Sequence, residues 1–552
     1  MTAFLIHNMA PIMFAALVVF LLLGYPAAFS LGAVGLIFGL IGIELGLFHP
    51  DFMQALPERV YGVMANDTLL AIPFFTFMGL VLERSGMAED LLDTVGQLFG
   101  TVRGGLAYAV IFVGALLAAT TGVVAASVIS MGLISLPIML RYGYDRRVAS
   151  GVIAASGTLA QIIPPSLVLI VMADQLGRSV GDMYEGAFIP GLVLSGLYAA
   201  YVFIVSMIFP KWTPGLPAEA IGFREDNGSR GLTSVFVLAI VSGLVGYAAM
   251  WESDAKGADF VVLTMFFGIG FALVIAILNR ISEKLFNYRF LSRIAQETTF
   301  VMVPPLLLIF LVLGTIFIGV ATPTEGGAMG AVGALILGLI KRRLSFDLIR
   351  QAVQSTAKLS AFVVFILIGA RVFSLTFYGV SGHVWVEELL VSLPGGQVGF
   401  LLFVNAMVFV LAFFLDFFEL AFIVIPLLGP AAEKLGIDLI WFGVILGVNM
   451  QTSFMHPPFG FALFYLRSVA PRERYKDRVT GKMMEPVTTG QIYWGAVPFV
   501  VIQVIMVILV IAFPAMVMHY KGAASTVDPN SVKIEVPALD IPPLNLDQPP
   551  KF

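Results

Sequence analysis

The sequence predicts an all-α polytopic membrane protein made of two inverted repeats, each with one re-entrant hairpin and one broken transmembrane helix. Hydrophobic residues make up 59% of the 552 positions and charged residues only 12%, a composition typical of integral membrane proteins. Two long apolar stretches 293 residues apart are interrupted in the same way, by small and polar residues and then a proline pair. The interruptions are 156–166 (SGTLAQIIPPS) and 449–460 (NMQTSFMHPPFG).

Each proline pair should break the helix that contains it, because proline lacks a backbone donor and clashes with the preceding turn. The released carbonyl groups are tolerated inside a bilayer only where they are buried in protein or line a cavity. Paired breaks at matching positions of two halves therefore point to the binding site of a transporter.

Hydropathy places the crossings along the chain. The apolar segments long enough to cross are 9–24, 28–48, 69–83, 148–176 (broken), 187–209, 232–251, 259–279, 299–320, 325–340, 359–380, 439–466 (broken) and 491–515. The longer stretches 106–140 and 400–433 carry small or acidic residues in the middle and predict re-entrant hairpins. The more polar stretches 52–66, 85–103 and 383–396 are typical of helices at the membrane interface. The first apolar run has no basic segment before it and predicts a retained span rather than a cleaved signal.

The halves match in one order, which predicts the domain organisation. At a constant offset of 293, Pro137, Gly143, Asp145, Ser156, Pro164 and Pro165 meet Pro430, Gly436, Asp438, Asn449, Pro457 and Pro458. We expect a first repeat at 1–210, an insert with two extra spans at 211–298, a second repeat at 299–515, and a disordered periplasmic tail at 516–552. Five crossings plus the two of the insert make an odd number, so the second repeat should be inverted.

Charge sorting orients this topology. Of the 31 Lys and Arg residues, 23 fall on one predicted face and 7 on the other, while Arg371 lies inside a span. The positive-inside rule makes the rich face cytoplasmic and puts both termini outside, in the periplasm. The expected location is a bacterial inner membrane.

Composition and motifs also exclude several functions. The chain has no cysteine, and its five histidines show no metal-ligand spacing. Walker A, HExxH and GxSxG motifs are missing, which disfavours an ATP-driven pump or a hydrolase. We therefore predict neither an enzyme nor a cofactor, and the net charge of −4 gives no sign of a nucleic-acid partner.

Several motifs carry a family resemblance. They are AASGTLAQIIPPS at 154–166, ATPTEGGAMGAVGAL at 321–335, FLDFFELAFIVIPLLGP at 414–430 and HPPFGFALFYL at 456–466. In this order they resemble the large membrane subunit of tripartite ATP-independent periplasmic (TRAP) transporters. The resemblance implies an elevator-type, sodium-coupled importer that works with a small four-helix membrane subunit and a periplasmic solute-binding protein.

The chain departs from the common family pattern in the extra spans, at Arg371, and at His456, where many members have threonine. With its insert, the QTSFMHPPFGFALFYL form looks closest to a branch associated with 2-oxo acids, lactate and aromatic carboxylates.

Two sodium sites are predicted at the helix breaks, because sodium prefers hard oxygen ligands and freed carbonyls supply them. Site 1 comprises Ser156, Gly157, Thr158 and carbonyls up to Pro164, facing the hairpin tip Thr120, Thr121 and Gly122. Site 2 comprises Asn449, Gln451, Thr452 and Ser453, facing Asp416 in the second hairpin. The alternative is that these hydroxyl groups only cap the broken helices or bond back to the preceding turn.

Charged residues within the spans are further candidates. Arg371, with Thr158 and His456, forms the predicted substrate site, since an arginine fork can bind a carboxylate. Arg371 could instead pair with Glu325 or another buried acid, and His456 could simply pack beside Pro457. Glu325, Asp145 and Asp438 are expected to be helix caps.

The predicted function is sodium-driven import of a small organic anion, a carboxylate such as a 2-oxo acid or hydroxy acid, delivered by the binding protein. A stand-alone sodium/organic anion symporter of the same superfamily is the alternative. The interface helices at 85–103 and 383–396 should brace a scaffold while the hairpins and broken spans move together.

Overall fold

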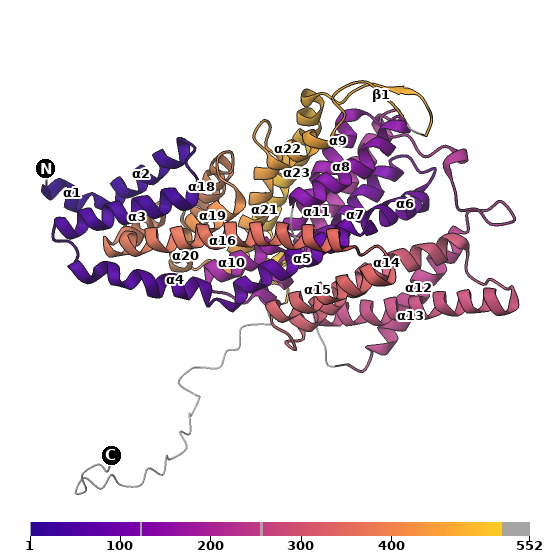
Figure 1. The fold of residues 1–552 in the computed structure, drawn as a ribbon, viewed down its shortest axis with the longest axis horizontal. Helices are drawn as coiled ribbons and strands as arrows, with labels where there is room; N and C mark the ends of the chain where they lie inside the picture. The colour runs from indigo at the N-terminus through magenta and orange to yellow at the C-terminus, as the bar shows by residue number, and fades with distance from the viewer. Residues whose placement is uncertain (1, 122–123, 254–257, 478, 521–552) are drawn as a thin grey trace, which may run out of the picture.

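The computed structural model describes residues 2–121, 124–253, 258–477 and 479–520. The described chain is helical nearly throughout, with one short ribbon in which β1 (Tyr475–Lys476) pairs antiparallel with β2 (Met483–Met484). The predicted tail lies almost wholly outside the described residues. Figure 1 shows one elongated body, in which the last long helices lie beside helices from the first third of the chain.

Helices recur in a similar order in the two halves. The first half holds α1 (Thr2–His7), α2 (Met9–Leu22), α3 (Ala27–Glu44), η1 (Pro50–Ala55), α4 (Leu56–Met64), η2 (Asp67–Leu70), α5 (Ala71–Arg84), α6 (Met87–Phe99), α7 (Gly105–Thr121), α8 (Val124–Arg141), α9 (Arg146–Thr158), η3 (Leu159–Gln161), α10 (Leu167–Leu176) and α11 (Val180–Ile208). After η4 (Ala218–Ala220), α12 (Leu232–Ala249) and α13 (Ala258–Phe286), the second half holds α14 (Arg293–Phe317), α15 (Pro323–Ile340), α16 (Phe346–Gly379), α17 (Gly382–Val391), α18 (Gly396–Leu411), α19 (Phe417–Ile423), α20 (Ile425–Lys434), α21 (Leu439–Met455), α22 (Phe461–Val469), α23 (Thr489–Ala512) and α24 (Ala515–Met518).

The all-α, multi-pass membrane class is confirmed. Within the described ranges, nine helices are long and apolar enough to cross a membrane, and eleven spans result if each sharply bent helix pair counts as one. One bent pair joins α17 to α18 at 116°, which turns the chain from the short helix α17 into the second hairpin.

Both hairpins and both broken helices are present where the sequence predicts them. The first hairpin is α7 and α8, and the second is α18 followed by α19 and α20. Helix α9 ends at Thr158 and resumes as α10, and α21 ends at Met455 and resumes as α22. Both proline pairs contain a cis peptide bond.

The expected helix caps before the broken spans are also present. Asp145 accepts hydrogen bonds from the first backbone N–H groups of α9, and Asp438 accepts from the equivalent groups of α21. Their backbone angles nearly coincide, with φ −60° and ψ 133° at Asp145, and φ −63° and ψ 127° at Asp438. The two halves therefore start their broken helices with the same local geometry.

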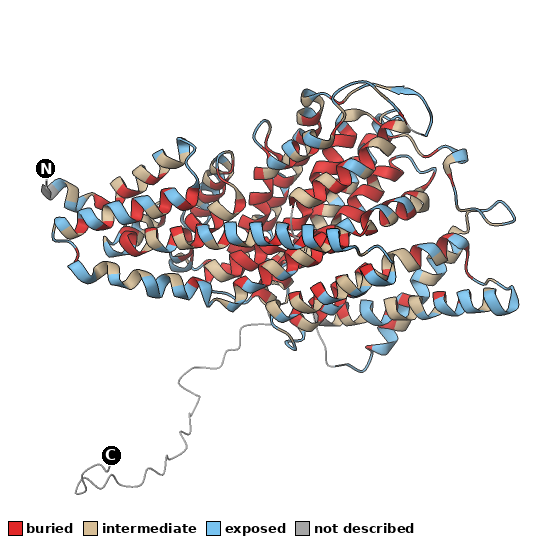
Figure 2. Cartoon of the chain, viewed as in Figure 1, coloured by how far each residue is buried: buried red, intermediate tan, exposed pale blue. Residues whose placement is uncertain are grey.

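The densest packing surrounds the breaks. Buried residues concentrate in the bundle of α7 to α11 with α21 to α23, whereas α12 and α13 of the insert are largely exposed (Figure 2). Helices α9 and α23 meet at Gly151 and Gly495, where a Cβ atom added to Gly151 would lie 2.1 Å from the Gly495 carbonyl oxygen. Only glycine allows this approach, which holds the first broken helix against a full-length span.

Candidate functional site

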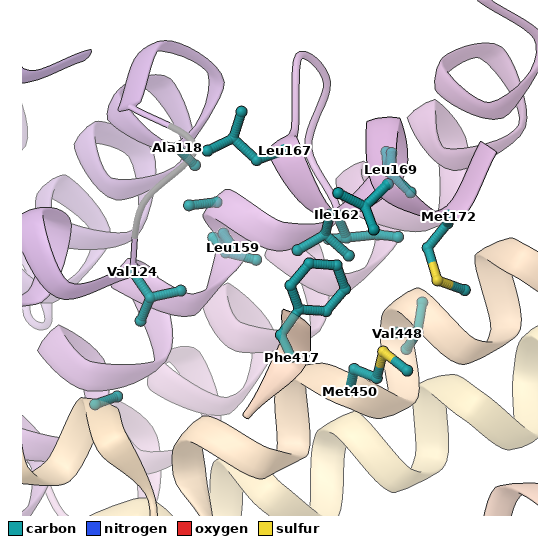
Figure 3. Packing of buried hydrophobic residues seen from close by; sticks show 14 of the residues in the cluster. Ala118, Val124, Leu159, Ile162, Leu167, Leu169, Met172, Phe417, Val448 and Met450 are labelled. Carbon is teal, nitrogen blue, oxygen red and sulfur yellow. The ribbon is translucent and has the colours of Figure 1, made fainter. Parts of the chain in front are cut away.

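A cavity of about 320 Å³ lies where the two hairpins and the two broken helices meet. We call it the central cavity. Its walls come from α8, the first break and α10 in one half, and from α16, α19, α21 and α22 in the other. Phe417 of the second hairpin belongs to the same buried cluster as Leu159 and Ile162 of the first break, so parts distant in sequence share one core here (Figure 3). The volume is at the lower end of the range usual for small-molecule sites.

Equivalent residues of the two halves line the central cavity. Four lining residues of the first half recur 293 positions later as lining residues of the second. The pairs are Val124 with Phe417, Ala125 with Phe418, Gln161 with Phe454, and Val168 with Phe461. A cavity lined by equivalent positions of both repeats is the arrangement expected of a substrate site at a repeat interface.

Three helices whose preceding residues are described begin at the central cavity. They are α10 at Leu167, α19 at Phe417 and α22 at Phe461, and all three residues line the cavity. A helix N-terminus carries partial positive charge and unpaired backbone N–H groups, of which the Ser166 hydroxyl caps one at α10 and the Asp416 carboxylate caps one at α19. Helix α22 has no side-chain cap, because its N-cap residue is Gly460. The convergence favours an anion in the cavity without any basic side chain in the described lining.

The first break packs directly against the first hairpin. A Cβ atom added to Gly114 of α7 would lie 2.5 Å from the Ser156 Cβ, and one added to Gly157 would lie 2.3 Å from a Val128 methyl of α8. The arms of the hairpin, α7 and α8, make these contacts. Gly122 lies outside the described residues, as do the side chains of Thr120 and Thr121.

The polar groups of the first break are deeply buried. Thr158 is fully buried, and its hydroxyl donates to the Ala155 carbonyl oxygen at 2.8 Å. This is the bond to the preceding turn that is expected if Thr158 does not bind sodium. Ser156 is also fully buried, and its hydroxyl has no hydrogen-bond partner among the described residues. A buried oxygen without a partner requires an explanation such as a bound ion or water.

Sequence reasoning missed a buried network beside this break. The Gln503 amide of α23 donates to the Tyr198 hydroxyl at 3.0 Å and to the Thr158 hydroxyl at 3.4 Å. Both Gln503 and Tyr198 are fully buried. A glutamine inside the apolar run VIQVIM is the signal that could have found it.

The second break bonds to the second hairpin. The Asn449 amide donates to the Asn405 carbonyl at 2.8 Å and to its side-chain oxygen at 3.0 Å, which ties α21 to α18. Thr452 and Ser453 donate to the carbonyls three residues earlier. Both side-chain polar atoms of the buried Gln451 have no partner within the described part of the chain. Each break therefore carries buried side-chain oxygens that lack a partner in the described chain, those of Ser156 and Gln161 in the first and that of Gln451 in the second.

Asp416 lines the central cavity and also caps a helix. It accepts a hydrogen bond from the Glu419 backbone N–H at 2.8 Å, and Glu419 accepts one from the Asp416 N–H at 3.0 Å. This capping box begins α19 in the second hairpin, which packs against α10 and α16. Glu325, expected to cap, forms the same box with Thr322 at the start of α15.

The three predicted substrate residues are not brought together, and none of them lines the central cavity. His456 is 2% exposed and packs between Phe409 and Phe413, with ring centroids 4.1 and 4.2 Å away. Thr158 belongs to the Gln503 network. Pro164 lines a different, apolar cavity against α13 and α14.

Arg371 lies in a separate cavity of about 490 Å³, which we call the outer cavity. Arg59 of α4 also lines it, and both arginines interact electrostatically with Tyr378. Neither arginine has an ion pair in the described residues, so the alternative in which Arg371 pairs with Glu325 or another buried acid is not observed there. The acids of this cavity are engaged elsewhere: Glu433 pairs with Arg178 at 2.9 Å, and Asp174 accepts from Asn66 at 2.7 Å.

A further cavity, of about 1350 Å³, lies between α6, α8 and α14 on the face predicted to be cytoplasmic. One wall is the loop after α22, which Asp477 fastens to the end of α8. Asp477 accepts two hydrogen bonds from the Arg141 Nε and two from Thr480. These bonds hold the pKa of the Asp477 carboxyl well below its usual range.

The fold and the symmetric cavity define a multi-pass membrane transport protein. The family profile described as "Tripartite ATP-independent periplasmic transporter, DctM component" matches residues 14–516, and the chain belongs to this family. It is a large permease subunit and not an enzyme.

This chain is similar to permeases that are named for different substrates. The C4-dicarboxylate TRAP transporter large permease protein DctM of Pseudomonas aeruginosa is 28% identical over 483 residues, which cover 86% of this chain and 92% of that protein. The isethionate TRAP transporter permease protein DctMQ of Oleidesulfovibrio alaskensis is 25% identical, covering 83% of this chain and 60% of that protein. The sialic acid TRAP transporter permease protein SiaT of Haemophilus influenzae is 22% identical, covering 91% of this chain and 67% of that protein.

Proposed function

We propose that this chain imports a small organic anion through the central cavity, driven by sodium that binds at the two helix breaks. The observation that carries the proposal is the convergence of three helix N-termini on a cavity lined by equivalent residues of both halves. The dipoles favour an anion at the centre. Its position at the repeat interface fits alternating access to the two sides of the membrane.

Sodium is supported by buried oxygens in the two broken helices. The Ser156 hydroxyl and the Gln451 amide oxygen are buried and lack partners in the part of the chain that the structure describes. Asp416 adds a carboxylate at the cavity wall. We place one sodium ion near Ser156, Gly157 and Thr158 and a second near Asn449, Gln451, Thr452 and Ser453, with Asp416 between the second ion and the substrate. A cation beside the carboxylate would offset the repulsion between Asp416 and an anionic substrate.

We propose an elevator motion, in which the hairpins and broken helices move against α3, α5, α15 and α16. The large cavity between α6 and α8 supports it, because it leaves space beside the second arm of the first hairpin. The natural chain lacks cysteine, so introduced cysteines can be linked selectively. Linking Thr94→Cys of α6 to Leu133→Cys of α8 with a rigid bismaleimide should stop transport, while either single variant stays active. Undiminished uptake by the linked protein would exclude relative motion at this cavity.

The outer cavity fits the arrival of substrate. Arg59 and Arg371 would attract an organic anion released by a periplasmic binding protein, since both guanidinium groups lack ion pairs within the described ranges. A small four-helix membrane subunit would complete the complex in a bacterial inner membrane, with both termini of this chain in the periplasm.

Reconstitution tests this function. Proteoliposomes carrying the chain and its small subunit should accumulate a labelled carboxylate only with an inward sodium gradient and the loaded binding protein outside. Collapsing the sodium gradient with an ionophore while keeping the proton gradient should abolish uptake. Persistent uptake after that treatment would refute sodium coupling, and uptake without the binding protein would identify a stand-alone symporter instead.

A further inference from the structure

Aromatic rings dominate the central cavity. Six of its lining residues are aromatic: Phe362, Phe417, Phe418, Phe454, Phe461 and Tyr465. All six belong to the second half of the chain. They come from α16, the second hairpin and the two parts of the second broken helix.

The rings are already ordered into two groups. Phe418 contacts Phe417 at 5.1 Å and Phe362 at 6.3 Å between ring centroids, both edge to face. Phe454 and Phe461 form a tilted pair at 5.9 Å. These distances and angles are those of favourable aromatic pairs, so the rings hold one another in place before a ligand arrives.

Comparison of equivalent positions shows that the aromatic rings of the cavity come from the second half alone. At each of the four equivalent pairs, the second half has phenylalanine where the first has valine, alanine, glutamine or valine. The polar member is Gln161, which is 1% exposed and whose side-chain oxygen has no partner in the described chain. The first half therefore contributes one buried amide among aliphatic side chains, and the second half contributes the aromatic rings together with Asp416.

Charge in the cavity limits the ligand further. Among the lining residues that the structure describes, Asp416 is the only ionisable group apart from Tyr465, and none is basic. The helix N-termini and Gln161 can hold one carboxylate. A second carboxylate would lie against phenylalanine rings, where burying an unpaired charge is strongly unfavourable.

Size agrees with these limits. At about 30 Å³ for each water-sized group, 320 Å³ holds a ligand of roughly ten non-hydrogen atoms. A single ring with a short acid side chain has that size, and a nine-carbon sugar acid is about twice as large.

We propose that the central cavity takes an aromatic monocarboxylate, with its carboxylate at Gln161 and the N-terminus of α10, and its ring among Phe362, Phe418 and Phe454. This rests on the proposed function, because it assumes that the central cavity is the transport site. The side-chain amide of Gln161 can rotate to present its N–H₂ group to the carboxylate. The ring of the ligand replaces the water that the phenylalanine side chains cannot hydrogen-bond.

Ligand-induced stabilisation of the full chain in lipid nanodiscs tests the proposal. In sodium buffer, phenylacetate should raise the unfolding temperature, while succinate and cyclohexylacetate at the same concentration should raise it less or not at all. Phe454→Leu should raise the half-maximal phenylacetate concentration about tenfold, because it removes a ring and keeps an apolar side chain. Phe236→Leu, on the exposed surface of α12, is the matched control and should change nothing.

The outcomes separate the two proposals. Succinate equal to or better than phenylacetate would overturn the aromatic class and leave sodium-driven anion transport intact. Equal stabilisation by cyclohexylacetate, or an unchanged phenylacetate midpoint in Phe454→Leu, would also overturn it. No stabilisation by sodium with any of the anions would refute the proposed function itself.

Discussion

Asp416 offers the sharpest test of sodium coupling, because its structural and ionic roles can be separated by two substitutions. As the N-cap of α19, it accepts the Glu419 N–H bond at 2.8 Å. Asp416→Ala removes that acceptor, and loss of an N-cap costs about 0.5–2 kcal/mol of stability. Asp416→Asn keeps an acceptor oxygen and should preserve most of the cap. Both substitutions remove the charge from the central cavity.

The size of the sodium effect follows from the lost charge. A bond to a charged group contributes about 1.5–3 kcal/mol, so its removal should weaken the affinity for sodium roughly 10- to 150-fold. Asp416→Asn should therefore shift the half-maximal sodium concentration for uptake at least tenfold upward, with only a small change in unfolding temperature. Asp416→Ala should show the same sodium shift and a further loss of stability.

The assay is uptake into proteoliposomes at a series of sodium concentrations, alongside thermal unfolding of the same preparations without sodium. Glu325→Gln is the matched control, since Glu325 forms the same capping box outside the central cavity. Its sodium midpoint should equal that of the natural chain. An unchanged sodium midpoint in Asp416→Asn would refute the reasoning and leave Asp416 as a helix cap alone.

Three further predictions concern packing, the cytoplasmic loop and the outer cavity. Gly151→Ala should destabilise the protein by about 1–3 kcal/mol, because the new methyl group meets the Gly495 carbonyl; thermal unfolding measures it. The lowered pKa of Asp477 means that its bonds to Arg141 stabilise the loop above the ordinary aspartate pKa and are lost only as pH falls through the lower, folded-state value. Limited proteolysis of this loop should therefore be equal at pH 8 and pH 5, and faster in Asp477→Asn at both. Arg371→Ala should leave folding intact and raise the concentration of loaded binding protein needed for half-maximal uptake.

Each of these predictions has a control. Gly196→Ala adds a methyl group where nothing lies within 4 Å, so it should not destabilise; equal destabilisation would show that helix packing is not the cause. Faster loop cleavage of the natural chain at pH 5 would contradict the lowered Asp477 pKa. Arg371→Lys keeps the charge and should be less impaired than Arg371→Ala, whereas normal uptake by Arg371→Ala would remove the outer cavity from the pathway.

Much of the architecture followed from the sequence because its signals are local. Hydropathy marks a span within the span itself, and a proline pair breaks its own helix whatever surrounds it. The caps at Asp145, Asp438 and Glu325 were predictable for the same reason, since an N-cap bonds to backbone groups two or three residues away.

The residues that line the central cavity could not be predicted, because they depend on which face of each broken helix turns toward the other half. His456 and Phe454 are two residues apart, yet Phe454 lines the central cavity and His456 packs into the second hairpin. Arg371 lies on α16, as does Phe362, but at the outer cavity. Gln161 gave no signal of its own beyond its place in the first break.

The sequence by itself determined a membrane protein of two related halves with a broken helix and a hairpin in each. Only the tertiary structure decided that these parts enclose one cavity, to which one half contributes Gln161 and the other contributes Asp416 and the aromatic rings. The physical reason is that close helix contacts, such as Gly151 with Gly495 and Gly157 with Val128, fix how the first broken helix is rotated. That rotation selects the residues that meet across 293 positions of chain.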